Sequence, residues 1–238
     1  MIVLAIDTCD SRGSVAVLRD GCELHVTAHE SREDYSSWLL RAVDEVLSSA
    51  GVRMAAVDGY AVASGPGSFT GLRVGLTTVK AWCEVHGKPV AAVSRLEALA
   101  VQAKEGAPYV AAFTDAQRGQ VFGAVYQRNG GDLVRLGEEL VIAPGKFIEY
   151  VAELSSQVRV SWISPDAPHL LGEAGWRERE RRGETIESVS GILAPMIGKM
   201  GGRRLAAGQH TDAVSLDANY VRRSDAEILW KDYLARGR

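Results

Sequence analysis

The stretch GPGSFTGLRVG at residues 65–75 has the composition that most strongly suggests chemistry. Glycine-rich turns that open a helix can hold phosphate through their backbone N–H groups. The spacing here departs from the common forms. No lysine follows the last glycine, as a Walker loop requires, and Thr70 replaces the third glycine of a dinucleotide-binding turn. Phosphate binding is therefore the weaker interpretation of this glycine loop, which comprises Gly65, Pro66, Gly67, Ser68, Phe69, Thr70 and Gly71.

The stronger interpretation is a tight strand-to-helix turn with a packing or interface role. Pro66 lacks a backbone N–H that an anion could use, and either Ser68 or Thr70 is suited to be the N-cap of the helix. Arg73 falls in the first helical turn, where its charge opposes the helix dipole. We therefore expect Arg73 to have a carboxylate partner or to face another chain.

Two polar turns after apolar runs offer a second kind of chemistry. Asp7 and Thr8 follow the run IVLAI, and Asp115 ends YVAAFTD. A carboxylate beside a hydroxyl can position a magnesium ion and a phosphate, whereas the simpler alternative is that each Asp caps its own turn. Both turns continue with bulky polar residues, CDSR and DAQR, where a phosphate site favours small residues with exposed amides. The pattern favours a degenerate nucleotide cleft over a working one.

Hydrolase and metal chemistry find no support in the sequence. His29 and Glu30 begin an HExxH pattern, but Glu33 replaces the second histidine of the zinc pair. Ser68 lacks the G-x-S-x-G spacing of a nucleophile elbow. The three cysteines have no metal-ligand spacing, and we expect neither a catalytic set nor a metal site.

Composition narrows the class of protein. The net charge of −3 over 238 residues gives no strong attraction to nucleic acid or anionic lipid. The basic residues at 177–182 and those at Arg222, Arg223 and Lys231 alternate with acidic ones, which is typical of a solvated face. An odd number of scattered cysteines, no signal-peptide pattern and no apolar run of about 20 residues predict a cytoplasmic protein without membrane contact.

The order of predicted elements repeats. Three strands, a helix at about 34–50, a strand at 57–64, a helix at 72–86, a strand at 89–94 and a helix at 95–104 form the first half. YVAAFTDAQRG (109–119) then echoes VLAIDTCDSRG (3–13), and three strands, a helix from Pro144, a strand at 158–164 and a helix at 190–205 follow. The stretch 176–188 is a surface helix or a loop. We predict an α/β, duplicated βββαβα, actin-like (ASKHA, ribonuclease H-like) two-lobe fold.

The predicted boundary lies near residue 104, with an N-terminal lobe at 1–104 and a C-terminal lobe at 105–238 whose last segment packs back on the first. Two helices of the first lobe carry more apolar side chains than one contact face needs, which favours a dimerisation surface. Trp38 and Leu40 widen the first of these helices. The expected interface residues are Tyr35, Trp38, Leu39, Val43, Val46, Leu72, Arg73 and Val79.

Several segments resemble the TsaB (YeaZ) family. They are AIDTCDSRGSVAV, GPGSFTGLRVGLTTVKAW, KPVAAVSRLEALA, AAFTDAQRGQVFGAVY and DANYVRRSDAE, and GPGSFTGLRVG is the most distinctive. The resemblance implies a non-catalytic subunit of the complex that transfers a threonylcarbamoyl group to the tRNA adenosine next to the anticodon. It implies pairing with the catalytic subunit TsaD, docking of TsaE on the pair, homodimers in isolation and tRNA contact that is at most indirect.

The resemblance also implies that ATP or ADP binds only weakly or at the junction with the partner subunit. The chain departs from the family pattern H-S-x-x-L-L-P in the first helix, where Tyr35 and Arg41 replace the histidine and the proline. The competing hypothesis is a small-molecule kinase or ATPase of the actin-like superfamily that uses Asp7 and Asp115 in the cleft between the lobes.

Overall fold

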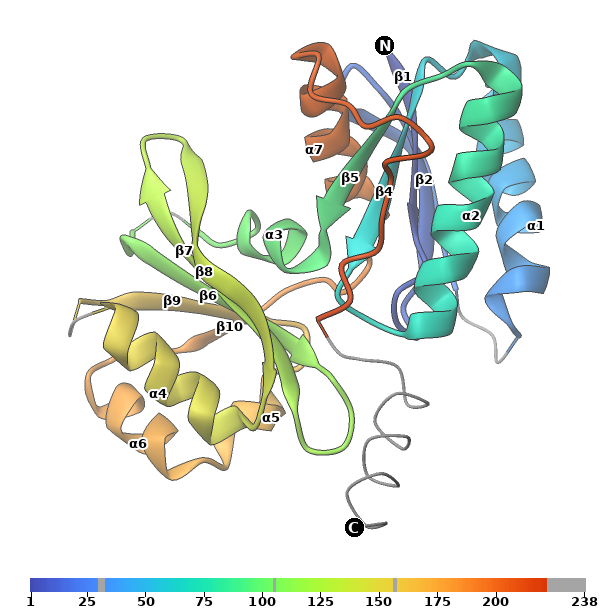
Figure 1. Ribbon diagram of the computed structural model, residues 1–238. Helices are drawn as coiled ribbons and strands as arrows, with labels where there is room; N and C mark the ends of the chain where they lie inside the picture. The colour runs from blue at the N-terminus through green and yellow to red at the C-terminus, as the bar shows by residue number, and fades with distance from the viewer. Residues whose placement is uncertain (30–32, 105, 156–157, 222–238) are drawn as a thin grey trace, which may run out of the picture.

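The computed structural model describes residues 1–29, 33–104, 106–155 and 158–221, arranged as two lobes (Figure 1). Arg222, Arg223 and Lys231, which were expected on a solvated face, lie outside the described residues. Each lobe is built on a five-stranded sheet, with strand order β3-β2-β1-β4-β5 in the first and β10-β9-β6-β7-β8 in the second. Listed from its other edge, the second sheet repeats the topology of the first. The predicted duplicated α/β fold is confirmed.

The first lobe contains strands β1 (Ile2–Asp7), β2 (Ser14–Arg19), β3 (Cys22–Ala28), β4 (Gly59–Gly65) and β5 (Val90–Ser94). β1 pairs antiparallel with β2 and parallel with β4, so it lies at the centre of the sheet and is buried on both faces. Helices α1 (Tyr35–Ser49) and α2 (Phe69–His86) cover one face (Figure 1). The short helix η1 (Met54–Ala56) leads into β4.

The second lobe repeats this plan with strands β6 (Tyr109–Asp115), β7 (Val121–Asn129), β8 (Asp132–Ile142), β9 (Val160–Ser164) and β10 (Ile186–Ser188). Successive residues of β6 alternate between two cores. Ala111 and Phe113 pack with Phe147 of α4 (Pro144–Ser155), whereas Val110 and Ala112 join the larger core that includes Leu96. Both faces of this sheet are therefore covered. Helices α5 (Pro168–Leu171) and α6 (Ala174–Arg181) pack beside α4.

The two lobes exchange helices. Helix α3 (Arg95–Ala100) follows β5 of the first sheet but packs on β6 and β7 of the second. Helix α7 (Ala194–Ala206) follows β10 and packs on β1, β2, β4 and β5 of the first sheet, opposite α1 and α2 (Figure 1). Each sheet is thus completed by the helix that leaves the other lobe.

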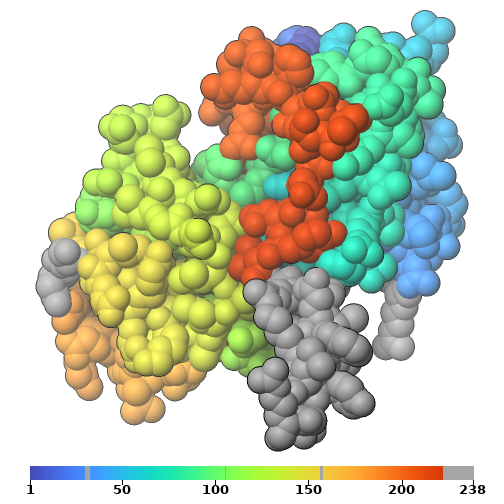
Figure 2. Space-filling view, viewed as in Figure 1, coloured from blue at the N-terminus to red at the C-terminus, as the bar shows by residue number. Residues whose placement is uncertain are grey.

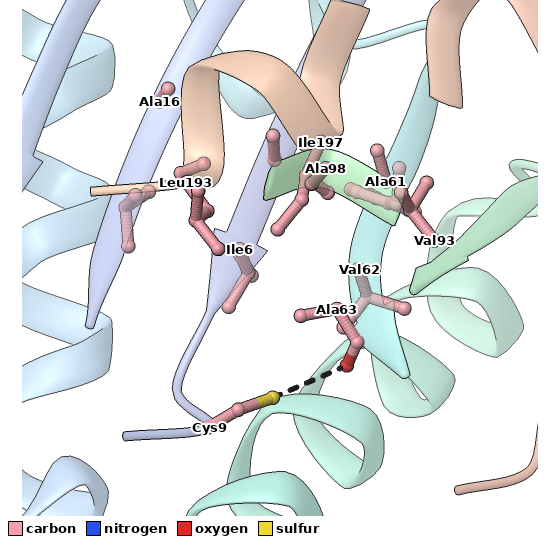
Figure 3. Packing of buried hydrophobic residues seen from close by; sticks show 14 of the residues in the cluster. Ile6, Cys9, Ala16, Ala61, Val62, Ala63, Val93, Ala98, Leu193 and Ile197 are labelled. Atoms are coloured by element: carbon pink, nitrogen blue, oxygen red, sulfur yellow. Dashed lines mark hydrogen bonds between the residues drawn. The ribbon is translucent and has the colours of Figure 1, made fainter. Parts of the chain in front are cut away.

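Small residues allow α7 to lie close to the first sheet. A Cβ at Gly198 would overlap Leu18, and a Cβ at Gly201 would overlap Ala61. Figure 3 shows Leu193, the N-cap of α7, and Ile197 of α7 reaching into the core formed by the first sheet. The spacing of apolar residues predicted this helix, although its start is Ala194 rather than residue 190.

The segment after α7 crosses the first lobe and touches the second. Thr211 forms a β-bridge with Val90, and the Asn219 backbone N–H donates to Ser64 O at 2.7 Å. The Asn219 side chain donates to Glu139 of β8 at 2.5 Å. Figure 2 shows this segment lying over the first lobe and against the second. This segment therefore contacts both lobes, and we call residues 207–221 the strap.

The stretch 176–188 contains most of α6, which confirms the expected surface helix for residues 176–181. It also contains the edge strand β10, which was not expected and pairs in parallel with β9. Arg179, expected on a solvated face, is buried and donates to the buried Glu184 at 3.3 Å. Glu184 also accepts a hydrogen bond from the Trp162 indole N–H at 2.6 Å. Arg179 and Trp162 thus both bond Glu184 beside the apolar core of the second lobe. No helix within the described ranges combines the length and apolarity needed to cross a bilayer.

Candidate functional site

The glycine loop is a turn that brings α2 close to the end of β1. Ser68 is the N-cap of α2, and its side chain accepts a hydrogen bond from the Gly71 N–H at 3.3 Å. Thr8 donates its hydroxyl to Gly71 O at 2.7 Å. A Cβ at Gly71 would overlap the Thr8 carbonyl, and a Cβ at Gly67 would overlap the Cys9 carbonyl. The glycines therefore leave room for protein backbone.

Arg73 finds its partners within the chain. Its guanidinium lies over the Phe69 ring, 3.8 Å from the ring centroid, and its Nε donates to the Tyr220 hydroxyl at 3.3 Å. The Phe69 and Tyr220 rings lie 4.9 Å apart. The expected carboxylate partner is wrong for the part of the chain that the structure describes. Arg73 remains exposed, and a contact with another chain stays a prediction.

A cleft of about 440 Å³ lies between the hairpin turns of the two lobes. The turn after β1 contributes Asp10 and Arg12, the glycine loop contributes Ser68, and the second lobe contributes Asp115 and Asp166. Such a volume is within the range of small-molecule sites. The charges on its walls, however, are already engaged with one another.

Asp7, expected in this cleft, is fully buried beneath it. Its Oδ1 accepts the Cys9 N–H at 2.9 Å, which is the expected turn cap, and its Oδ2 accepts from Arg95 Nε at 2.9 Å. Arg95 is buried as well and comes from the start of α3. Thr8 is also buried and bonded to Gly71. Neither Asp7 nor Thr8 lines the cleft, because packing and the Arg95 ion pair enclose both.

A row of alternating charges continues from Asp7 to the second lobe. Arg95 Nη2 lies 2.7 Å from Asp10 Oδ2, which also accepts from Arg12 Nη2 at 2.7 Å. Arg12 then donates to both carboxylate oxygens of Asp166, at 2.8 and 3.0 Å. We call Asp7, Arg95, Asp10, Arg12 and Asp166 the charge row. Its last ion pair joins the first hairpin to the loop after β9.

Asp166 is surrounded by hydrogen-bond donors from three residues. It accepts the Thr114 hydroxyl at 2.7 Å and the Asp115 N–H at 2.9 Å, besides Arg12. Burial raises the pKa of Asp166, but the hydrogen bonds from Arg12, Asp115 and Thr114 outweigh it and lower the pKa to about 2. The carboxylate is therefore ionised throughout the neutral range.

Asp115 does line the cleft, as expected. Its carboxylate accepts the backbone N–H and the side-chain amide of Gln117, at 2.8 and 2.6 Å, and lies 3.2 Å from His169 Nε2. Gln117 and Arg118 have positive φ angles, so the turn is held in the left-handed region by this Asp cap. Within the described residues, no group of three or more His, Cys, Asp or Glu side chains is placed to hold a metal ion.

The predicted interface residues divide into two groups. Tyr35 and Arg73 reach the surface at least in part, whereas the others are buried in the core of the chain itself. The prediction of a direct partner contact is therefore wrong for the residues whose side chains pack beneath the helices. They are Trp38, Leu39, Val43, Val46, Leu72 and Val79. Their apolar stripe faces the sheet, which is the ordinary reason for such a stripe.

The exposed face of the helix pair carries other residues. Leu40 of α1 is 60% exposed and Val85 of α2 is 77% exposed. Arg41, which replaces the family proline, forms an ion pair with Glu33. These side chains, rather than the buried stripe, are the ones that a partner protein could contact.

Tyr35, which replaces the family histidine, binds the first hairpin. Its hydroxyl donates to Asp10 O and accepts the Gly13 N–H at 2.9 Å. A Cβ at Gly13 would overlap the Tyr35 ring. The tyrosine is thus built into the turn that carries Asp10 and Arg12, and it lines the cleft.

Sequence reasoning missed Arg95, Asp10, Arg12 and Asp166 as cleft residues. Arg12 and Arg118 occupy equivalent places in the repeat, which was a usable signal for Arg12. Arg95 directly follows β5, and Asp166 follows β9 by two residues; both strands are parallel to the central strand of their sheet or to its neighbour. Since such strand ends converge on a ligand site in sheets of this kind, their charges could have been noted.

Comparison with known proteins supplies a family. A model described as "TsaD: tRNA N6-adenosine threonylcarbamoyltransferase" matches residues 26–167. The tRNA threonylcarbamoyladenosine biosynthesis protein TsaB of Escherichia coli K12 is 30% identical over 230 residues, covering 92% of this chain and 96% of that protein.

Solved structures agree in fold. YeaZ from Pseudomonas aeruginosa superposes with a TM-score of 0.67 at 28% identity, covering 92% of this chain and 99% of that one. A ROK family protein from Streptococcus pneumoniae, solved with sucrose, reaches a TM-score of 0.51 at 13% identity and covers 88% of this chain. The second likeness concerns the two-lobe architecture alone.

Proposed function

Because the chain belongs to the TsaB (YeaZ) family and hence to tRNA threonylcarbamoyladenosine biosynthesis, we propose that it is a non-catalytic subunit of the threonylcarbamoyl-transferring complex. In this proposal it pairs with the catalytic subunit TsaD through the exposed face of α1 and α2. TsaE docks on the assembled pair, and tRNA contacts this chain at most indirectly. Isolated copies pair with each other through the same face.

The main support for a non-catalytic role is that both carboxylate oxygens of Asp7 are already bonded within the chain. Its carboxylate is fully buried and bonded to Arg95 and to the Cys9 N–H. An Asp that served a magnesium-bound phosphate would need an open oxygen facing the cleft. The other members of the charge row are likewise bonded to one another. These ion pairs support a structural role for the charges rather than a catalytic one. We propose that ATP and ADP bind weakly at most, or at the junction with TsaD.

The exposed face of α1 and α2 supports the pairing. Large apolar side chains at the surface of a helix pair are what protein interfaces use as anchors. Leu40 and Val85 are of this kind, and α1 and α2 lie side by side on one face of the first sheet (Figure 1). A flat pair of helices suits packing against a second helix pair.

Light scattering of a mixture with TsaD from the same organism tests the pairing. We expect one species whose mass is the sum of the two chains. Separate elution of both proteins, at concentrations well above micromolar, would refute the proposal.

Calorimetry with Mg-ATP separates this function from a small-molecule kinase or ATPase. The isolated chain should give no micromolar binding. Micromolar binding that Asp115→Asn removes would favour the enzyme, since Asp115 lines the cleft and its carboxylate is partly accessible.

A further inference from the structure

The ion pair between Arg12 and Asp166 spans the two lobes. Arg12 lies in the turn between β1 and β2, and Asp166 lies in the loop between β9 and α5. Both N–H groups at the end of the guanidinium meet a carboxylate oxygen, at 2.8 and 3.0 Å. Two parallel hydrogen bonds of this kind fix orientation as well as distance. The pair therefore constrains how one lobe can turn relative to the other.

The surroundings hold Arg12 in this position. Asp10 accepts from both Nε and Nη2 of Arg12, at 3.2 and 2.7 Å, so the guanidinium lies between two carboxylates. Gly191 leaves the space that the side chain fills, because a Cβ there would lie 2.8 Å from Arg12 Cδ. The Arg12 side chain is 30% exposed and that of Asp166 is 16% exposed, which limits screening by water and salt.

The charge row extends this constraint into the core. Negative and positive groups alternate from Asp7 through Arg95, Asp10 and Arg12 to Asp166, and each neighbouring pair is in direct contact. Arg95 also starts α3, which packs on the second sheet. The row thus begins at the buried end of β1 and ends in the second lobe.

A second connection closes the other side. Glu139 of β8 accepts hydrogen bonds from the Ser94 hydroxyl and from the Asn219 side chain, both at 2.5 Å. Ser94 ends β5 of the first sheet, and Asn219 belongs to the strap. This contact joins the lobes at a second place besides the Arg12–Asp166 ion pair, in addition to the exchanged helices α3 and α7.

From this geometry we infer that Arg12 is a built-in interlobe lock: its bidentate ion pair with Asp166 holds the two lobes in a fixed relative orientation around the cleft. The Arg12 guanidinium supplies a positive charge that joins the two lobes from within the chain. The lock is a property of the isolated chain, so its test needs no partner protein.

Pulsed electron resonance between two spin labels measures the lobe separation directly. One label is placed on Cys22, which is exposed while Cys9 and Cys83 are buried, and the other on Lys146→Cys, an exposed position of α4. The wild-type lock should give a narrow distance distribution that Mg-ATP does not shift.

Three variants test the lock itself. Arg12→Ala removes the ion pair, Arg12→Lys keeps the charge but loses the paired geometry, and Asp166→Asn removes the charge of the acceptor. Each should broaden the distribution toward longer distances, and Arg12→Ala combined with Asp166→Asn should broaden it no further than either alone. Arg53→Ala, a change of an exposed arginine away from the cleft, should leave it unchanged. A wild-type distribution in the Arg12 variants, or a wild-type protein that closes only with Mg-ATP, would overturn the inference.

Discussion

At the scale of single residues, the cleft shows how charges can be used for structure in a place where this architecture permits chemistry. Asp7, which the sequence suggested as a magnesium-binding carboxylate, is bonded to Arg95 and to a backbone N–H instead. A buried ion pair of this kind adds little net stability over an apolar replacement. Breaking it is costly, because one buried charge is left without its partner.

Replacing Arg95 with methionine should therefore destabilise the protein by roughly 3–5 kcal/mol. The long apolar side chain fills most of the space of Arg95 but leaves the fully buried Asp7 carboxyl group without its ion-pair partner. Urea unfolding followed by circular dichroism measures the change. A loss below about 1 kcal/mol would show that Asp7 is not dependent on Arg95.

Asp166 gives a prediction about pH. Its pKa in the folded protein is about 2, below the value of about 3.9 of an unfolded chain. A lowered folded-state pKa contributes stability above the unfolded value, and this contribution is lost as the pH falls from about 4 toward 2. The contribution of the ionised Asp166 at neutral pH is at most about 2 kcal/mol.

The difference in unfolding free energy between the wild type and Asp166→Asn isolates this effect from other acidic groups. The difference should be largest at pH 5–7 and should shrink below about pH 4. A difference that stays constant down to pH 3 would contradict the lowered pKa.

At the scale of elements, α2 depends on the close approach of its first turns to the end of β1. Gly71 lies within a helix, where alanine normally stabilises by about 1 kcal/mol. Here a Cβ would overlap the Thr8 carbonyl, which is backbone and cannot rotate away. Gly71→Ala should instead cost roughly 1–3 kcal/mol.

Gly131→Ala is the matched control for this change. Gly131 has open space around its Cβ position, and its φ is not positive. Thermal unfolding of the two variants should show a clear loss for Gly71→Ala and almost none for Gly131→Ala. Equal melting temperatures would mean that α2 is free to move away from β1.

The helix pair gives the prediction on assembly. Leu40→Asp places a charge on the exposed face of α1 and should weaken pairing with TsaD about tenfold or more, as loss of an interface anchor does. Leu171→Asp changes a leucine of similar exposure, 50%, in the second lobe and should leave pairing intact. Light scattering and titration calorimetry measure both. Equal loss in both variants would place the interface elsewhere.

Local sequence patterns predicted the order of helices and strands. They did not predict that the apolar face of α1 is covered by the sheet of its own lobe. The stripe of Leu39, Val43 and Val46 predicted a helix with an apolar face, but a single sequence cannot tell whether a sheet or a partner covers it. Leu40 is the large apolar residue of α1 that lies outside this stripe and is exposed. Similarly, β10 is three residues long in a polar stretch, and its pairing with β9 depends on contacts far along the chain.

At the scale of the whole molecule, the two lobes exchange α3 and α7. The sequence predicted the sheets of the lobes but not the ion pair that joins them. The repeat VLAIDTCDSRG and YVAAFTDAQRG predicted the two sheets, because each carries its own strand order. The ion pairs between the lobes were not predictable, since they join turns more than 150 residues apart, as Arg12 and Asp166 do. Distances of that kind need the assembled fold.

We propose that the chain is a structural subunit whose surface, rather than its cleft, serves tRNA modification. Transfer of the threonylcarbamoyl group to tRNA by TsaD, with TsaE and threonylcarbamoyl-adenylate, tests this most directly. Adding the wild-type chain or Leu171→Asp should raise the transfer rate well above that of TsaD and TsaE alone, whereas Leu40→Asp should not. A transfer rate that is the same with and without the wild-type chain would contradict the account.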